Sequence, residues 1–66
     1  MKVYRYLTGG DDAAFCHKVT EALNKGFELY GNPHHAVGPD GKVVCGQAVV
    51  KEADGDYHPG VTLSDL

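Results

Sequence analysis

The stretch HHAVGPDGKVVCGQAVVKE, residues 34–52, decides the fold because it joins two extended segments through a turn. In Gly38-Pro39-Asp40-Gly41, proline presets one backbone dihedral and the last glycine permits a positive φ, which is typical of a tight turn. Residues 42–52 are rich in valine and predict the last long strand. We therefore expect residues 34–37 to lie in a strand antiparallel to residues 42–52.

Upstream of this hairpin, residues 27–30, FELY, extend the first of its two strands. The strand then meets Gly31-Asn32-Pro33 before it continues into the histidine pair. Pro33 lacks the N–H that a central ladder needs, so the sequence predicts a bulge or a kink at this point.

Residues 11–25, DDAAFCHKVTEALNK, predict a helix. Its apolar residues recur at helical spacing and form one stripe, which consists of Phe15, Val19, Ala22 and Leu23. Two N-terminal caps fit: Thr8 with Asp11 reaching back in a capping box, or Asp11 or Asp12 capping directly. Gly26 follows the last residue and favours a left-handed C-terminal turn.

Residues 2–8, KVYRYLT, predict a first strand that stops at Gly9-Gly10. Both of its faces carry apolar area, so the inward face stays open. The order β-α-β-β predicts a small α+β domain over residues 1–53, with residues 54–66 as an extended C-terminal arm. A right-handed crossover makes the first two strands parallel, and the simplest antiparallel sheet then has the order 1-3-2.

The small residues of the last strand favour close approach of the helix. We therefore expect one set of residues beneath the helix, namely Val44, Gly46, Ala48 and Val50. The opposite face would be uncovered and would supply the interface candidates Tyr4, Tyr6, Tyr30, Cys45, Gln47 and Val49. An apolar face of this kind favours a two-fold dimer. The arm would pack on a neighbour through Tyr57, Val61 and Leu63.

The size and charge of the chain narrow the function classes. Domains below about 70–80 residues usually need extra stabilisation, and self-association is one source for these 66 residues. The formal charge of −3 and the absence of a basic stripe argue against nucleic-acid binding. No apolar run approaches the length of a membrane span.

Cys16 and Cys45 match neither a disulfide framework nor a zinc spacing. The stretch MKVYRYLTGGDD lacks the apolar segment of an export signal. We therefore expect a cytoplasmic protein with both thiols reduced.

The histidines and cysteines form no evident catalytic group or intrachain metal site. His34 and His35 are adjacent in a strand and point to opposite faces. Cys16 and His17 are helix neighbours that diverge, and His17 can pair with Glu21 instead. We expect no enzyme activity and no cofactor. The alternative is a small-molecule or metal site assembled between chains from His34, His35, His17 or Cys45.

Several stretches carry a family resemblance. YRYLTGGDDAAFCHKVTEALNKGFELYG, the PDG turn and CGQAVVKE together resemble the bacterial family called domain of unknown function 1737, over roughly residues 2–53. ALNKGFEL is similar to the broader family numbered 4177. The resemblance implies a small α+β protein. The chain departs from the family pattern at two positions, Gly10, where proline is common in the family, and Phe27, where tryptophan is common, and both departures are structural in kind. It implies no catalytic residue, cofactor or substrate, and the histidine pair belongs to no motif of the family.

Overall fold

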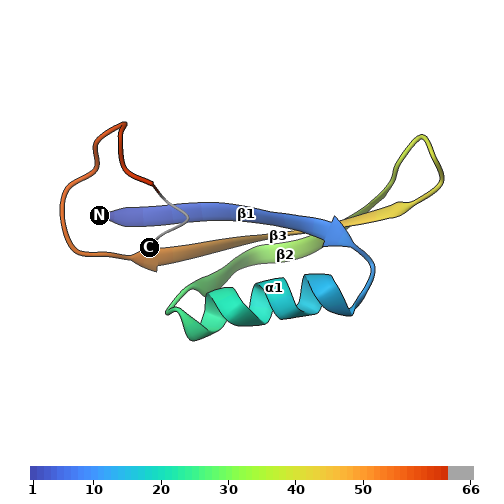
Figure 1. Cartoon of the computed structure of the whole chain (residues 1–66), viewed down its shortest axis with the longest axis horizontal. Helices are drawn as coiled ribbons and strands as arrows, with labels where there is room; N and C mark the ends of the chain where they lie inside the picture. The colour runs from blue at the N-terminus through green and yellow to red at the C-terminus, as the bar shows by residue number, and fades with distance from the viewer. Residues whose placement is uncertain (63–66) are drawn as a thin grey trace.

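The computed structural model describes residues 1–62. The elements are β1 (Lys2–Gly10), α1 (Ala13–Asn24), β2 (Glu28–Val37) and β3 (Val43–Glu52). The strands form one sheet of order β1-β3-β2, in which β3 is antiparallel to both neighbours. Figure 1 shows α1 running along one face of this sheet. The expected α+β fold and strand order are confirmed.

The turn between β2 and β3 has the expected chemistry. Gly41 has a φ of 80°, and its N–H donates to the Gly38 carbonyl oxygen at 2.9 Å. Asp40 Oδ1 accepts from the Lys42 N–H at 3.1 Å. The turn places Val37 opposite Val43 and so sets the register of the hairpin.

Helix α1 is capped directly by an aspartate. Asp12 is the N-cap, and its Oδ1 accepts from the Phe15 N–H at 3.0 Å. Of the two caps that fit the sequence, the structure therefore has the direct one, and the capping box on Thr8 is wrong. Gly26 follows the helix with a φ of 97°, which is the expected left-handed turn.

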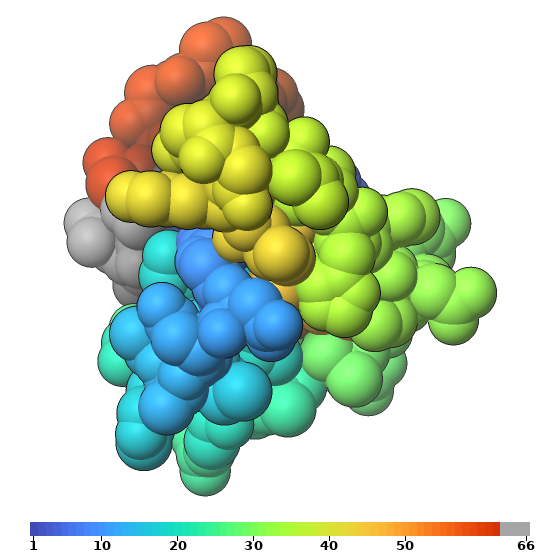
Figure 2. Space-filling model, turned by 90° about the vertical axis from the view of Figure 1, so that its right-hand side faces the viewer, coloured from blue at the N-terminus to red at the C-terminus, as the bar shows by residue number. Residues whose placement is uncertain are grey.

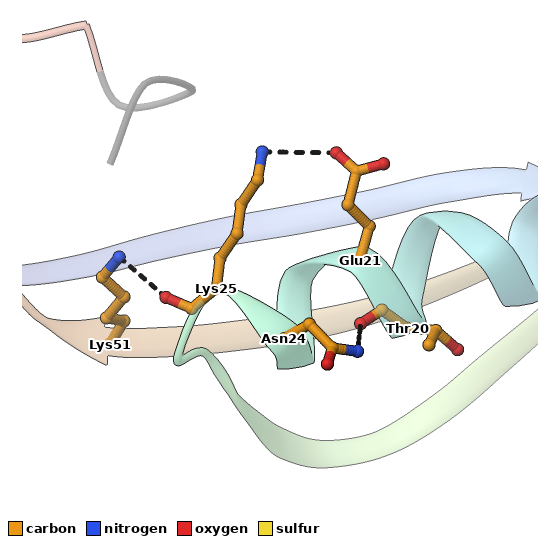
Figure 3. A network of polar contacts seen from close by, with 5 residues as sticks. All are labelled: Thr20, Glu21, Asn24, Lys25 and Lys51. Carbon is orange, nitrogen blue, oxygen red and sulfur yellow. Dashed lines mark hydrogen bonds and ion pairs between the residues drawn. The ribbon is translucent and has the colours of Figure 1, made fainter.

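The C-terminal end of α1 is tied to β3, as Figure 3 shows. Lys51 Nζ donates to the Lys25 carbonyl oxygen at 3.0 Å, which satisfies an acceptor at the helix end. Lys25 Nζ lies 3.2 Å from Glu21 Oε1. The sequence suggested His17 as the partner of Glu21, whereas the structure pairs Glu21 with Lys25.

The core lies between α1 and the β1–β3 part of the sheet. Its buried residues are Val3, Leu7, Ala22, Phe27 and Val49. Val3 and Leu7 therefore mark the inward face of β1, which the sequence left open. Phe15 packs over Gly9, where an added Cβ would lie only 3.0 Å from the ring carbon Cδ1. The close approach of the helix is thus made to β1.

The face assigned to the last strand was wrong. Val44, Gly46, Ala48 and Val50 lie on the side of β3 away from α1, and the buried residues Cys45, Gln47 and Val49 lie beneath the helix. The space above Gly46 is taken by another strand, since an added Cβ would overlap the Tyr6 hydroxyl. The small residue therefore accommodates a tyrosine of β1 and not the helix.

The expected bulge in β2 is confirmed. Tyr30 pairs with Ala48 and His34 with Gly46, so three residues of β2 face the single residue Gln47. Gln47 is buried, and its side-chain Nε2 donates to the carbonyl oxygens of Tyr30 and Gly31, each at 3.4 Å. It also donates to the Ala48 carbonyl oxygen at 2.8 Å. A buried amide thus donates to carbonyl groups at the point where the ladder is broken.

The chain is elongated. Its radius of gyration is 13.3 Å, against about 11 Å for a compact domain of this length. The segment after β3 lies at the end of the sheet that holds the N-terminus (Figure 1), where the Ala53 N–H donates to the Met1 carbonyl oxygen. Leu63, one residue of the expected arm contact, lies outside the described residues. Within residues 1–62, no helix is both long enough and apolar enough to cross a membrane.

Candidate functional site

The sheet has one side that α1 does not cover, which we call the open face. Strand alternation places Tyr4 and Tyr6 of β1 on this side, because they pair with Val50 and Ala48 of β3. Tyr30 of β2 also pairs with Ala48. The apolar members of the open face are therefore Tyr4, Tyr6, Tyr30, Val44, Ala48 and Val50.

Its aromatic side chains are largely in contact with solvent. The exposed fractions are 55% for Tyr4, 49% for Tyr6 and 62% for Tyr30. Val44 on the central strand is 46% exposed, although β3 has a neighbour on each side. Helix α1 lies on the other side of the sheet, and the segment after β3 rises on the side away from α1 at the end that holds the N-terminus (Figure 1). Three tyrosines and a central valine thus form a contiguous apolar surface.

Charged residues lie at one end of the open face. Lys2 pairs with Glu52, and Glu28 pairs with Val50 near the same end. The middle of the face holds Tyr6, Ala48 and Tyr30 and carries no formal charge. A second apolar surface could approach this region without burying an ionised side chain, which would cost several kcal/mol unless it were paired.

The structure divides the predicted interface residues into two groups. Tyr4, Tyr6 and Tyr30 lie on the open face, as expected, and their interface role stays a prediction. Three other candidates, Cys45, Gln47 and Val49, are buried beneath α1 and cannot form part of that surface. Their assignment failed because both faces of β3 carry small or apolar residues, so alternation alone did not distinguish them.

The histidines separate as their positions predicted. His34 pairs with Gly46 on the open face, whereas His35 pairs with Cys45 on the helix side. His17 is exposed on α1, close to Arg5 and Lys25. Of the four residues considered for an inter-chain site, only His35 and Cys45 are brought together.

Asp11 was not predicted from the sequence as a partner of this pair. It was expected only as a candidate helix cap, a role that Asp12 performs. One feature of the strand pairing places Asp11 near this pair. Cys45 on the central strand pairs with His35 of β2 at one edge and with Gly9 of β1 at the other, and Asp11 follows Gly9 by two residues. That feature depends on the strand register and cannot be obtained from spacing alone.

The two thiols differ in environment. Both are free, with Cys16 exposed and Cys45 buried. Burial raises the pKa of the Cys45 thiol above its ordinary value, and the charges of Asp11, Asp12 and Cys16 add to the effect. A thiol held in its neutral form is a weak nucleophile, so Cys45 is poorly suited to covalent catalysis.

The comparison with known families agrees with this fold. A family model described as domain of unknown function (DUF1737) matches residues 1–52, which contain all four elements. The chain belongs to this family. Its description names no activity, so the match adds no catalytic residue, substrate or partner. No curated protein and no solved structure matches the chain.

Proposed function

We propose that this DUF1737 chain is a non-enzymatic interaction module that forms a homodimer through its open face. The observation that carries the proposal is the exposure of Tyr4, Tyr6 and Tyr30 on a face that α1 does not cover. Aromatic residues are enriched at protein interfaces, because they combine a large apolar area with a polar group that can remain hydrated.

The small core supports a second copy as the occupant of this face. Burial of apolar surface contributes about 25 cal/mol per Å², and within residues 1–62 the core cluster contains five buried side chains from α1, the sheet and the loop between them. A two-fold contact brings the same apolar surface from each chain together. The uncharged middle of the open face fits such a self-contact, since no like charges would oppose each other there.

The irregular outer edge of β2 favours a dimer in which two open faces meet over one in which a second chain pairs with that edge strand. Its outer edge is interrupted by the bulge, which contains Gly31 with a φ of 71° and Pro33 without an N–H donor. Interruptions of this kind disfavour strand addition. A cytoplasmic setting belongs to the same proposal and is supported by the two free thiols.

A dilution series in an analytical ultracentrifuge tests self-association. We expect twice the mass of one chain at high concentration, with a dissociation constant of about 1 µM or below. A well-folded species with the mass of one chain at low micromolar concentration would contradict the proposal.

Two adjacent substitutions test the location of the contact. Tyr30 and Leu29 are similarly exposed, at 62% and 55%, but lie on opposite faces of β2. We expect Tyr30→Lys to weaken dimerisation at least about tenfold, since it truncates an aromatic residue at the interface and adds a charge. Leu29→Lys should leave the dimer unchanged. Equal effects of both variants would show that the open face is not the contact.

A further inference from the structure

Three potential metal ligands converge at one end of the helix side of the sheet. The donor atoms of Asp11, His35 and Cys45 all lie within 4.8 Å of one another. No other trio of histidine, cysteine and acidic side chains in residues 1–62 is grouped in this way. The three residues are far apart in the sequence, so the cluster is a product of the fold.

The strand register explains the convergence. Cys45 lies on the central strand, with His35 paired to it across β2 and Gly9 paired to it across β1. The chain leaves β1 after Gly10 and places Asp11 at the same end. Figure 2 looks onto this end, where the blue end of β1, the yellow-green end of β2 and the gold start of β3 meet.

The donor set has a definite metal preference. Zn²⁺ accepts cysteine sulfur, histidine nitrogen and carboxylate oxygen, and sites with three protein ligands keep a fourth position open. Ca²⁺ and Mg²⁺ instead take oxygen ligands. A soft sulfur combined with an imidazole therefore favours zinc over these harder cations.

The geometry needs only a small contraction. Bond lengths of about 2.0–2.3 Å in a tetrahedral zinc site place the donor atoms roughly 3.5 Å apart. The observed limit of 4.8 Å exceeds this separation by about 1.3 Å. Cys45 is buried and fixed, whereas Asp11 and His35 are exposed and can change rotamer.

Solvent access and nearby negative charge also make the site suitable for a cation. Asp11 and His35 line an open hollow together with Ala36, Val37 and Val43, which leaves solvent access beside the cluster. The carboxyl groups of Asp11 and Asp12 place negative charge near the Cys45 thiol. A divalent cation would compensate that charge and would stabilise the thiolate that ligation requires.

We propose that Asp11, His35 and Cys45 bind one Zn²⁺ within a single chain, with the fourth coordination position open to solvent. The site lies on the helix side of the sheet and shares no residue with the apolar members of the open face. It therefore does not depend on homodimerisation, and either proposal can fail without the other.

Cobalt binding tests the site without any assumption about activity. The full chain, reduced and without a histidine tag, is titrated with Co²⁺ and followed by absorption spectroscopy. We expect a thiolate-to-cobalt charge-transfer band that saturates at one ion per chain and disappears when Zn²⁺ is added. Absence of the band would overturn the proposal, and so would saturation at one ion per two chains.

Neighbouring residues provide matched controls for the ligands. His35→Ala and Cys45→Ala should abolish the band, whereas His34→Ala and Cys16→Ala should retain it. Loss of a ligand should weaken zinc affinity by more than the roughly 10–100-fold that loss of an outer-shell partner costs.

The exposed position of His35 keeps this test valid if the buried Cys45 variant fails to fold. Circular dichroism checks that the His35 variant is folded. Zn²⁺ should raise the melting temperature of the unmodified chain but not of His35→Ala. An equal loss of the cobalt band in His34→Ala, or its loss in Cys16→Ala, would contradict the assigned ligands.

Discussion

Gln47 shows how a single side chain can hold an irregular strand in place. Its buried amide donates to the carbonyl oxygens of Tyr30 and Gly31 at the β2 bulge. Tyr30 is the last paired residue before the bulge and Gly31 the first one without a partner in the ladder, so the amide bonds to carbonyl groups where the regular pairing stops. From the sequence, Gln47 was expected on the open face as an interface candidate, because the small residues Gly46 and Ala48 were expected beneath the helix.

We predict that Gln47→Leu lowers the free energy of unfolding by about 1–3 kcal/mol, because it removes the partner of buried carbonyl groups. For a domain of this size, each kcal/mol corresponds to about 4–8 °C in melting temperature. Thermal unfolding at a fixed protein concentration measures the change.

Asn24→Leu is the matched control for this substitution. The Asn24 side chain also donates to a carbonyl oxygen, that of Thr20 at 2.9 Å, but at an exposed position where water can replace it (Figure 3). We expect a change within about 0.5 kcal/mol. A similar loss of stability in both variants would show that the bulge does not depend on Gln47.

Gly9 and Gly46 explain why the face of β3 beneath the helix could not be predicted from residue sizes. Gly46 was expected beneath the helix, but its open side is occupied by Tyr6. The position that accommodates a helix residue is Gly9, which contacts Phe15. A Cβ at Gly46 would require Tyr6 to move, and a Cβ at Gly9 would press against Phe15. A sequence alone does not reveal which aromatic ring fills each space.

At the scale of the element, local signals predicted most of the structure. The turn at residues 38–41, the left-handed Gly26 and the bulge before His34 all depend on glycine and proline chemistry within a few residues. The face of β3 depends on the packing of distant elements. It was mispredicted because Val44 and Val50 on one side resemble Val49 on the other.

Helix α1 gives an element-scale prediction about capping. Asp12 accepts a hydrogen bond from the Phe15 N–H, whereas the neighbouring Asp11 is not the cap. We predict that Asp12→Ala lowers the free energy of unfolding by about 1 kcal/mol. Denaturant unfolding in metal-free buffer measures the change.

Asp11→Ala is the control for charge in this experiment. It removes one negative charge near the same helix end, where the dipole contribution is about 0.3–1 kcal/mol. The difference between the two variants isolates the capping hydrogen bond. If Asp11→Ala were the more destabilising, the assigned cap would be wrong.

At the scale of the whole molecule, one helix and a three-stranded sheet leave an elongated chain with a single small core. Packing of α1 buries the apolar residues on one side of the sheet, whereas three tyrosines on the other side stay exposed. The sequence predicted that one face would be uncovered, but it assigned only the tyrosines of β1 and β2 to that face correctly. The candidate zinc ligands required the three-dimensional register, since Asp11 meets His35 and Cys45 only after the sheet has formed.

Self-association through the open face is the central claim, and inter-chain nuclear Overhauser effects test it most directly. A sample that mixes isotope-labelled and unlabelled chains reports contacts between copies only. We predict contacts from the rings of Tyr6 and Tyr30 in one chain to the methyl groups of Val44 and Val50 in the other. Inter-chain contacts confined to the outer edge of β1 or to α1, or none at a concentration where the chain is dimeric, would contradict the account.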